Sequence, residues 1–109
     1  MASDMQLNNS FQRIPDPFIR REQNPAQVIE NYERGIRCFR STRSPRMEVM
    51  TRLALAQYLL MQNRHDEARV QLAQSGVLIR QGTNQANAVQ YYLLMNQLNQ
   101  LNRLNQLNR

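Results

Sequence analysis

Large and small apolar residues alternate at helical spacing from Leu53 to Leu72, on both sides of a short polar segment. Residues three or four positions apart share one face of an α-helix, so this pattern predicts two amphipathic helices joined by a tight turn. Small side chains let two helix backbones approach closely, as a hairpin that stacks on another requires. The positions expected to pack the hairpin are Leu55, Ala56, Leu59, Ala68 and Leu72.

Capping residues predict where the helices begin and end. Asn24-Pro25 is a favoured start, because Asn caps well and Pro suits the first helical position, and Ser44-Pro45 has the same form. Gln81-Gly82 is a helix stop. The predicted helices cover about residues 25–40, 46–61, 66–80 and 86–97.

Single positions inside these helices carry further expectations. Gly76 disfavours helix, so we expect it where a neighbouring helix comes close. Cys38 lies near an apolar helix face, where a lone cysteine usually belongs to the core. The inner face of the fourth helix is predicted to comprise Ala88, Tyr91, Tyr92, Met95 and Leu98.

The two ends of the chain differ from its centre. Residues 1–23 are expected to form an extended or disordered arm, because Pro15 and Pro17 exclude a helix there. Residues 24–97 form the predicted helical domain. Residues 98–109 repeat the unit LNQLNR, which we interpret as a frayed helical tail, since Asn is a poor helix former. The alternative is an oligomerising helix in which buried Asn sets the register.

Length and composition agree with one small helical domain. The chain has 109 residues, with 3 Gly, 4 Pro and no Trp, and its aromatic content of 6% is low for a sheet. We therefore predict an all-α fold of about four helices packed as antiparallel hairpins, preceded by an irregular arm.

Charge adds a second feature, because all 14 cationic residues are Arg and the net charge is +6. The Arg residues gather around the end of the first predicted helix, at intervals of three. One interpretation is a surface that binds an anionic partner, since Arg offers a planar fork of donors to phosphate and carboxylate. The other is a solvated face. The candidate partner- or anion-binding residues are Arg34, Arg37, Arg40, Arg43, Arg46 and Arg52.

Residues that carry chemistry are sparse. His65 is the one histidine, and a helix-capping turn accounts for it and the two acids that follow. There is no glycine-rich phosphate loop, no paired Cys or His set for a metal, and no nucleophile beside a base. We expect no catalytic residues, no metal and no cofactor. The longest apolar runs are too short to cross a membrane, and no signal peptide is evident, so we expect an intracellular protein, cytoplasmic or nuclear.

The segment 48–79 resembles one tetratricopeptide repeat. Leu55, Ala56 and Leu59 match the family's large-small-large pattern on the first helix, and Asp66-Glu67-Ala68 matches its acidic start to the second. Arg52 stands where the family often has an aromatic residue, and Arg80 where it has its closing Pro. The resemblance implies a stacked helical scaffold that binds peptides or proteins, and it implies no chemistry.

Three functional hypotheses follow. The first is a non-enzymatic interaction module, an adaptor or chaperone-like protein, that binds a peptide or protein partner, with an acidic one favoured by the Arg residues. The second is a basic helical protein that binds double-stranded RNA or DNA as a homodimer through rows of Arg. The third is a subunit of a larger assembly in which the tail becomes ordered.

Overall fold

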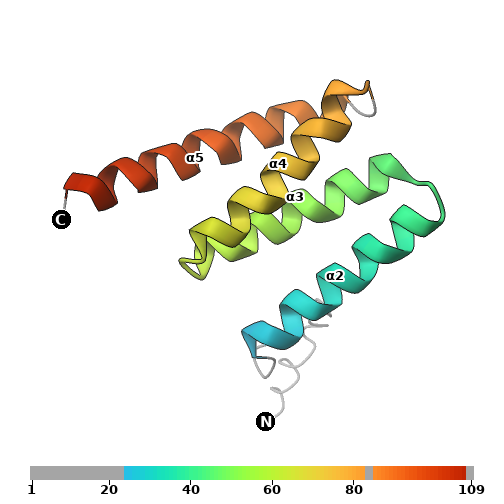
Figure 1. Cartoon of the computed structure of the whole chain (residues 1–109), viewed down its shortest axis with the longest axis horizontal. Helices are drawn as coiled ribbons and strands as arrows, with labels where there is room; N and C mark the ends of the chain where they lie inside the picture. The colour runs from blue at the N-terminus through green and yellow to red at the C-terminus, as the bar shows by residue number, and fades with distance from the viewer. Residues whose placement is uncertain (1–23, 83–84, 108–109) are drawn as a thin grey trace, which may run out of the picture.

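The computed structural model describes residues 24–82 and 85–107, and all regular structure among them is helical (Figure 1). The all-α prediction is therefore confirmed. The N-terminal arm lies outside the described residues. In chain order the elements are α2 (Pro25–Ser41), α3 (Pro45–Met61), α4 (His65–Arg80), a single 3₁₀ turn η1 (Gln85–Asn87) and α5 (Ala88–Leu107).

The predicted helix starts are correct in position. Asn24 caps α2, since its Oδ1 accepts a hydrogen bond of 2.8 Å from the backbone N–H of Gln27. Ser44 precedes Pro45 at the start of α3 but makes no side-chain cap bond, and its hydroxyl lies 3.2 Å from that of Thr42.

The α2–α3 and α3–α4 turns have the same backbone design. Each places one residue in the left-handed region, Arg43 with φ 57° and Asn63 with φ 60°. The next N–H then bonds back to a carbonyl five residues earlier, from Ser44 to Phe39 at 2.8 Å and from Arg64 to Leu59 at 2.9 Å. This pattern satisfies carbonyls at a helix end and reverses the chain within three residues. Consecutive helices therefore run in opposite directions (Figure 1).

The core is centred on α3, which packs against α2, α4 and α5. Ala56 and Ala68 are fully buried, so α3 and α4 meet closely at the predicted small positions. The predicted large residues Leu55, Leu59 and Leu72 are at most 2% exposed. The hairpin-packing prediction is thus confirmed for Leu55, Ala56, Leu59, Ala68 and Leu72.

Gly76 is the point where α5 approaches α4. A Cβ atom on Gly76 would lie 2.7 Å from the hydroxyl oxygen of Tyr91, which confirms the expected close approach. On the inner face of α5, Leu94 takes the place that was predicted for Tyr92. Leu94 is buried, whereas Tyr92 is 61% exposed. Leu94 and Leu98 are four residues apart, so they share the face of α5 that turns toward the core.

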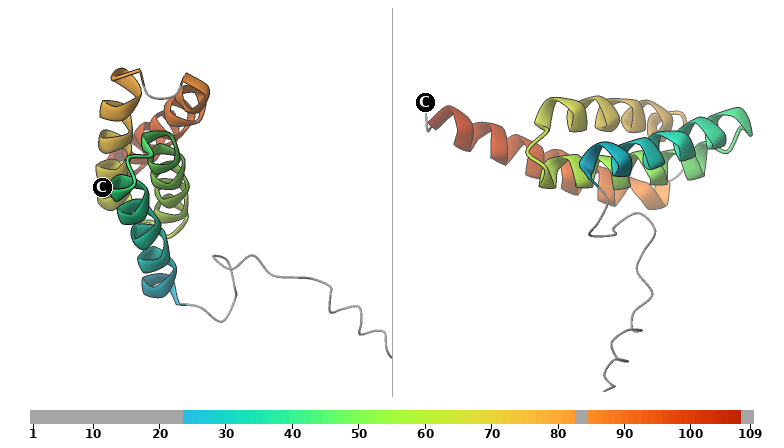
Figure 2. Two further views of the ribbon diagram at one scale, coloured as in Figure 1. Left: turned by 90° about the vertical axis from the view of Figure 1, so that its right-hand side faces the viewer. Right: turned by 90° about the horizontal axis from the view of Figure 1, so that it is seen from below.

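The C-terminal repeat continues α5 as far as Leu107, so the predicted helical tail is helical over the described residues. Leu98 is buried and Leu101 packs against the core, and this tertiary contact outweighs the weak helix propensity of the intervening Asn residues. The last turns of α5 project beyond the α3–α4 hairpin, as two viewing directions show (Figures 1 and 2).

Candidate functional site

An apolar hollow lies between α2 and α3, and its volume is about 440 Å³. Gly35 forms part of its floor, where a side chain is absent and the Thr51 methyl group would lie 3.6 Å from an added Cβ. Met47 and Met50 rise from α3 and are 41% and 46% exposed. The complete lining is Asn31, Tyr32, Gly35, Phe39, Met47, Met50, Thr51 and Ala54.

The sequence pattern did not single out this hollow. Tyr32 and Phe39 fall on the apolar face of α2 and read as core residues, yet both are only half-buried. The signal that was available is Gly35 between them, together with Met at positions 47 and 50. Gly removes volume from a helix face, and Met supplies an adaptable apolar wall.

Two arginines lie in the sequence between Phe39 and Met47, the lining residues nearest the α2–α3 turn. Arg43 belongs to the turn itself and Arg46 to the first turn of α3, next to the lining residue Met47. Both are exposed, and neither forms an ion pair with a residue that the structure describes. Their guanidinium groups are therefore available to carboxylates of a partner or of residues that the structure does not describe.

The other predicted Arg residues are largely engaged with acids of the chain. Arg34 and Arg37 both face Glu30, with N–O distances of 3.8 and 3.2 Å, on the solvent side of α2. Arg40 lies 3.6 Å from Glu48. The six candidates thus do not form one surface, because α2 turns through about 120° between Arg34 and Arg40 and α3 carries Arg52 inward.

Arg52 is a correction to the predicted anion-binding set, since it is 4% exposed. Its Nη2 and Nε both lie 3.0 Å from Glu48 Oε2, and its Nη1 donates to Gln71 Oε1 on α4 at 2.8 Å. The i,i+4 spacing of Glu48 and Arg52 is a local signal for this pair. Arg52 therefore ties α3 to α4 and does not face a partner.

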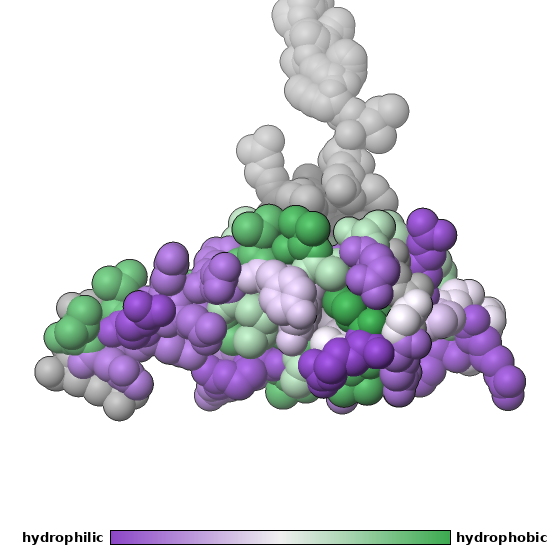
Figure 3. Space-filling view, turned by 90° about the horizontal axis from the view of Figure 1, so that it is seen from above, coloured by the Kyte–Doolittle hydropathy of each residue, from purple (hydrophilic) through white to green (hydrophobic). Residues whose placement is uncertain are grey.

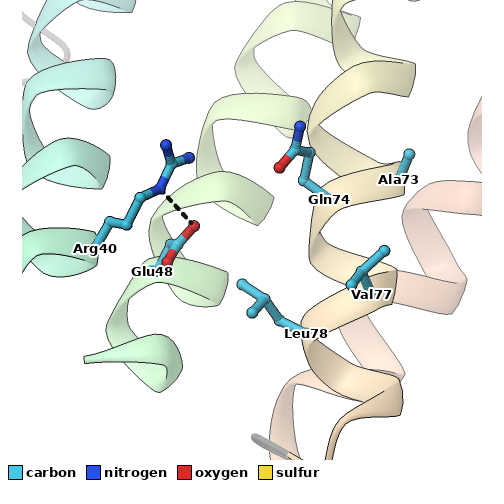
Figure 4. A pocket seen from close by; sticks show the side chains of 6 residues that line it. All are labelled: Arg40, Glu48, Ala73, Gln74, Val77 and Leu78. Carbon is cyan, nitrogen blue, oxygen red and sulfur yellow. Dashed lines mark ion pairs between the residues drawn. The ribbon is translucent and has the colours of Figure 1, made fainter. Parts of the chain in front are cut away.

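A second groove lies on the α4 side of α3, with a volume of about 590 Å³. Arg40 and Glu48 form one wall, where they make an ion pair with each other. Helix α4 supplies the opposite wall (Figure 4). The α4 residues are Ala73, Gln74, Val77 and Leu78. Because its charged groups already pair with each other, this groove offers an incoming ligand little free charge.

The α3–α4 turn is also internally paired. Arg64 donates to both carboxylate oxygens of Glu67, and Arg69 lies 2.8 Å from Asp66. The hydrogen bond to Glu67 raises the pKa of the Arg64 guanidinium above its ordinary value. Asp66 and Glu67 occupy the first turn of α4, as predicted from the helix dipole.

Cys38 is exposed, so its assignment to the core is wrong. The buried face of α2 follows Ile36, and Cys38 lies two residues, or about 200°, further around the helix. His65 is half-buried at the start of α4. Among residues 24–82 and 85–107, no group of three or more His, Cys, Asp or Glu side chains is placed to hold a metal ion.

Comparison with known proteins found no matching family model, no matching curated protein and no matching solved structure. None of the helices described here combines the length and the apolar character required to span a bilayer.

Proposed function

We propose that this chain is a non-enzymatic protein–protein interaction module, an adaptor or chaperone-like protein, whose α2–α3 hollow binds an apolar segment of a peptide or protein partner. The observation that carries the proposal is the hollow itself. Its lining is almost wholly apolar, it remains open to solvent, and its volume of about 440 Å³ lies in the range typical of ligand pockets. Concave sites with a mostly apolar lining are where ligands usually bind.

The walls of the hollow suit a side chain from a macromolecule. Phe39 and Tyr32 offer rigid aromatic surface, and Met47 and Met50 can change rotamer to fit the occupant. Aromatic residues and Met are enriched at the cores of protein interfaces. An apolar anchor residue of the partner would fill this space.

The charge beside the hollow favours a partner with acidic residues near that anchor. Arg43 and Arg46 have no ion-pair partner among the described residues, unlike most of the Arg residues around them. Such exposed charges steer association and select partners more than they add affinity. Binding should therefore weaken with salt without being abolished by it.

The packing order is compatible with a tetratricopeptide-like scaffold. The helices α3 and α4 would correspond to one repeat, α5 to the first helix of the next and α2 to the second helix of a preceding one. Repeats of this kind stack so that each helix contacts its neighbours. This correspondence supports an interaction role and remains a proposal.

Binding of double-stranded RNA or DNA is the second candidate function. It depends on how many cations can reach phosphates, because each phosphate contact adds to affinity and to its salt dependence. Glu30 and Glu48 lie within 3.8 Å of Arg34, Arg37 and Arg40 and reduce the net positive charge of that surface, and Arg52 is buried. These contacts favour the protein partner over the nucleic acid.

A co-purification experiment with matched variants tests the proposal. The full chain and its Met50→Glu and Met61→Glu variants would be recovered from nuclease-treated extract. Both methionines are exposed on α3, but only Met50 lines the hollow. We expect Met50→Glu to reduce a defined bound protein by tenfold or more and Met61→Glu to retain it. Equal retention by both variants would contradict the proposal, as would recovery of no bound protein from the nuclease-treated extract.

A further inference from the structure

The outward face of α5 carries an apolar stripe. At about 100° per residue, Val89, Leu93, Leu104 and Leu107 fall within about 60° of one another, on the side opposite the buried Leu98. They are 67%, 58%, 54% and 79% exposed. At the C-terminal end of α5, on the left of Figure 3, hydrophobic side chains stand at the surface among hydrophilic ones. No described helix covers this stripe.

The stripe is symmetric about its middle. Val89 and Leu107 are each nine residues from Leu98, and Asn96 and Gln100 are each two residues from it. Leu93 and Leu104 are five and six residues away. Reversing the helix about Leu98 therefore places apolar residues on apolar residues and amides on amides.

We propose that two copies of this chain pair through α5 in antiparallel orientation, around a twofold axis at the level of Leu98. Val89 then faces Leu107 of the second copy, and Leu93 faces Leu104. A twofold interface uses the same patch on both copies, so the patch must be complementary to its own reverse, as this one is. Asn96 and Gln100 meet at the centre, where each amide offers donors and acceptors to the other.

The placement of an aromatic ring and a cation supports the same orientation. Tyr92 and Arg103 lie on one edge of the stripe, and a twofold axis brings that edge against its own copy. Tyr92 of one copy is then level with Arg103 of the other, within one residue. Tyr92 is 61% exposed, and Arg103 forms no ion pair with any described residue. Two cation–π contacts, one on each side of the axis, follow from the symmetry.

The small size of the stripe predicts a weak interface. A helix of 20 residues is about 30 Å long and about 12 Å wide, so pairing covers roughly 700 Å² over both copies. A stable protein interface usually buries about 1,600 Å². We therefore expect a weak monomer–dimer equilibrium that depends on protein concentration.

Sedimentation equilibrium of the full chain between 5 and about 500 µM tests the pairing, with Val89→Glu and Val70→Glu as matched variants. Both valines are exposed on helices, but only Val89 lies on the stripe. We expect Val89→Glu to weaken dimerisation at least tenfold and Val70→Glu to leave it unchanged. A monomer at every concentration, or an equal effect of both variants, would overturn the proposal.

A mixing experiment tests the orientation and guards against misfolded variants. The dimer contains the contact between positions 93 and 104 twice. In a dimer of Leu93→Glu alone, or of Leu104→Arg alone, both of these contacts place a charge against a leucine. In an antiparallel mixed dimer, Glu at position 93 meets Arg at position 104, and the other contact remains Leu with Leu. We expect each variant to be monomeric and the equimolar mixture to dimerise. A mixture that stays monomeric would overturn the antiparallel arrangement.

Discussion

Replacing Arg52 by Met is expected to be one of the most destabilising single changes in the α3–α4 hairpin. The Arg52 and Glu48 side chains are 5% and 9% exposed, so both charges are largely withdrawn from water. Met keeps an unbranched apolar stem but leaves the Glu48 carboxylate with Arg40 alone, at 3.6 Å. It also removes the donor to Gln71.

The magnitude follows from the asymmetry of buried ion pairs. Removing one partner costs about 3–5 kcal/mol, because the other charge stays buried and unpaired, while replacing both partners by apolar residues is often nearly neutral. Arg40 partly compensates here, so we expect a loss of about 3 kcal/mol for Arg52→Met. The double variant Glu48→Leu/Arg52→Met should lose only about 1 kcal/mol.

Urea unfolding followed by circular dichroism measures these differences. With an m-value of about 1.5 kcal/mol/M, a loss of 3 kcal/mol lowers the midpoint by about 2 M. A free energy of unfolding for Arg52→Met within about 1 kcal/mol of the parent would contradict a stabilising buried ion pair. A double variant that loses the sum of the two single changes would also contradict it, since independent sites would behave in that way.

Two further substitutions test local features. Asn24→Ala should cost about 1 kcal/mol in urea unfolding, because the Gln27 N–H loses its cap; no change would show that α2 does not need this cap. Gly76→Ala should destabilise by about 1 kcal/mol despite better helix propensity, because its Cβ would lie 2.7 Å from the Tyr91 hydroxyl. Tyr91→Phe should recover part of that loss, and a stabilised Gly76→Ala would refute the close contact.

The local pattern was sufficient to predict the hairpin. Leu55, Ala56 and Leu72 follow helical spacing, and their burial depends mainly on which face of each helix turns inward. The cap at Asn24 is likewise a property of neighbouring residues. Features encoded within one or two helical turns were therefore visible in the sequence.

The features that depend on distant contacts were not visible in the sequence. Arg52 belongs to a run of arginines, and its burial follows from Gln71, which lies 19 residues away on α4. The length of α5 depends on the packing of Leu98 and Leu101 against the core, which outweighs weak helix propensity. The α2–α3 hollow is lined by residues of both helices, with Gly35 supplying no side chain, and a single helix pattern does not contain that geometry.

The two proposed surfaces lie on different helices and do not compete. Pairing through α5 would leave the α2–α3 hollow of each copy open, so a dimer would present two hollows. A partner with two anchor segments would then gain avidity from the second binding event.

Site-specific photo-cross-linking tests the central claim most directly. A photoreactive side chain would replace Met50 in the hollow, and Met61 in a matched control, and the nuclease-treated full chain would be irradiated with its extract. The proposal predicts a discrete protein adduct from position 50 alone, mapped to an apolar segment with acidic neighbours. The same adducts from both positions, or no protein adduct from position 50, would contradict it.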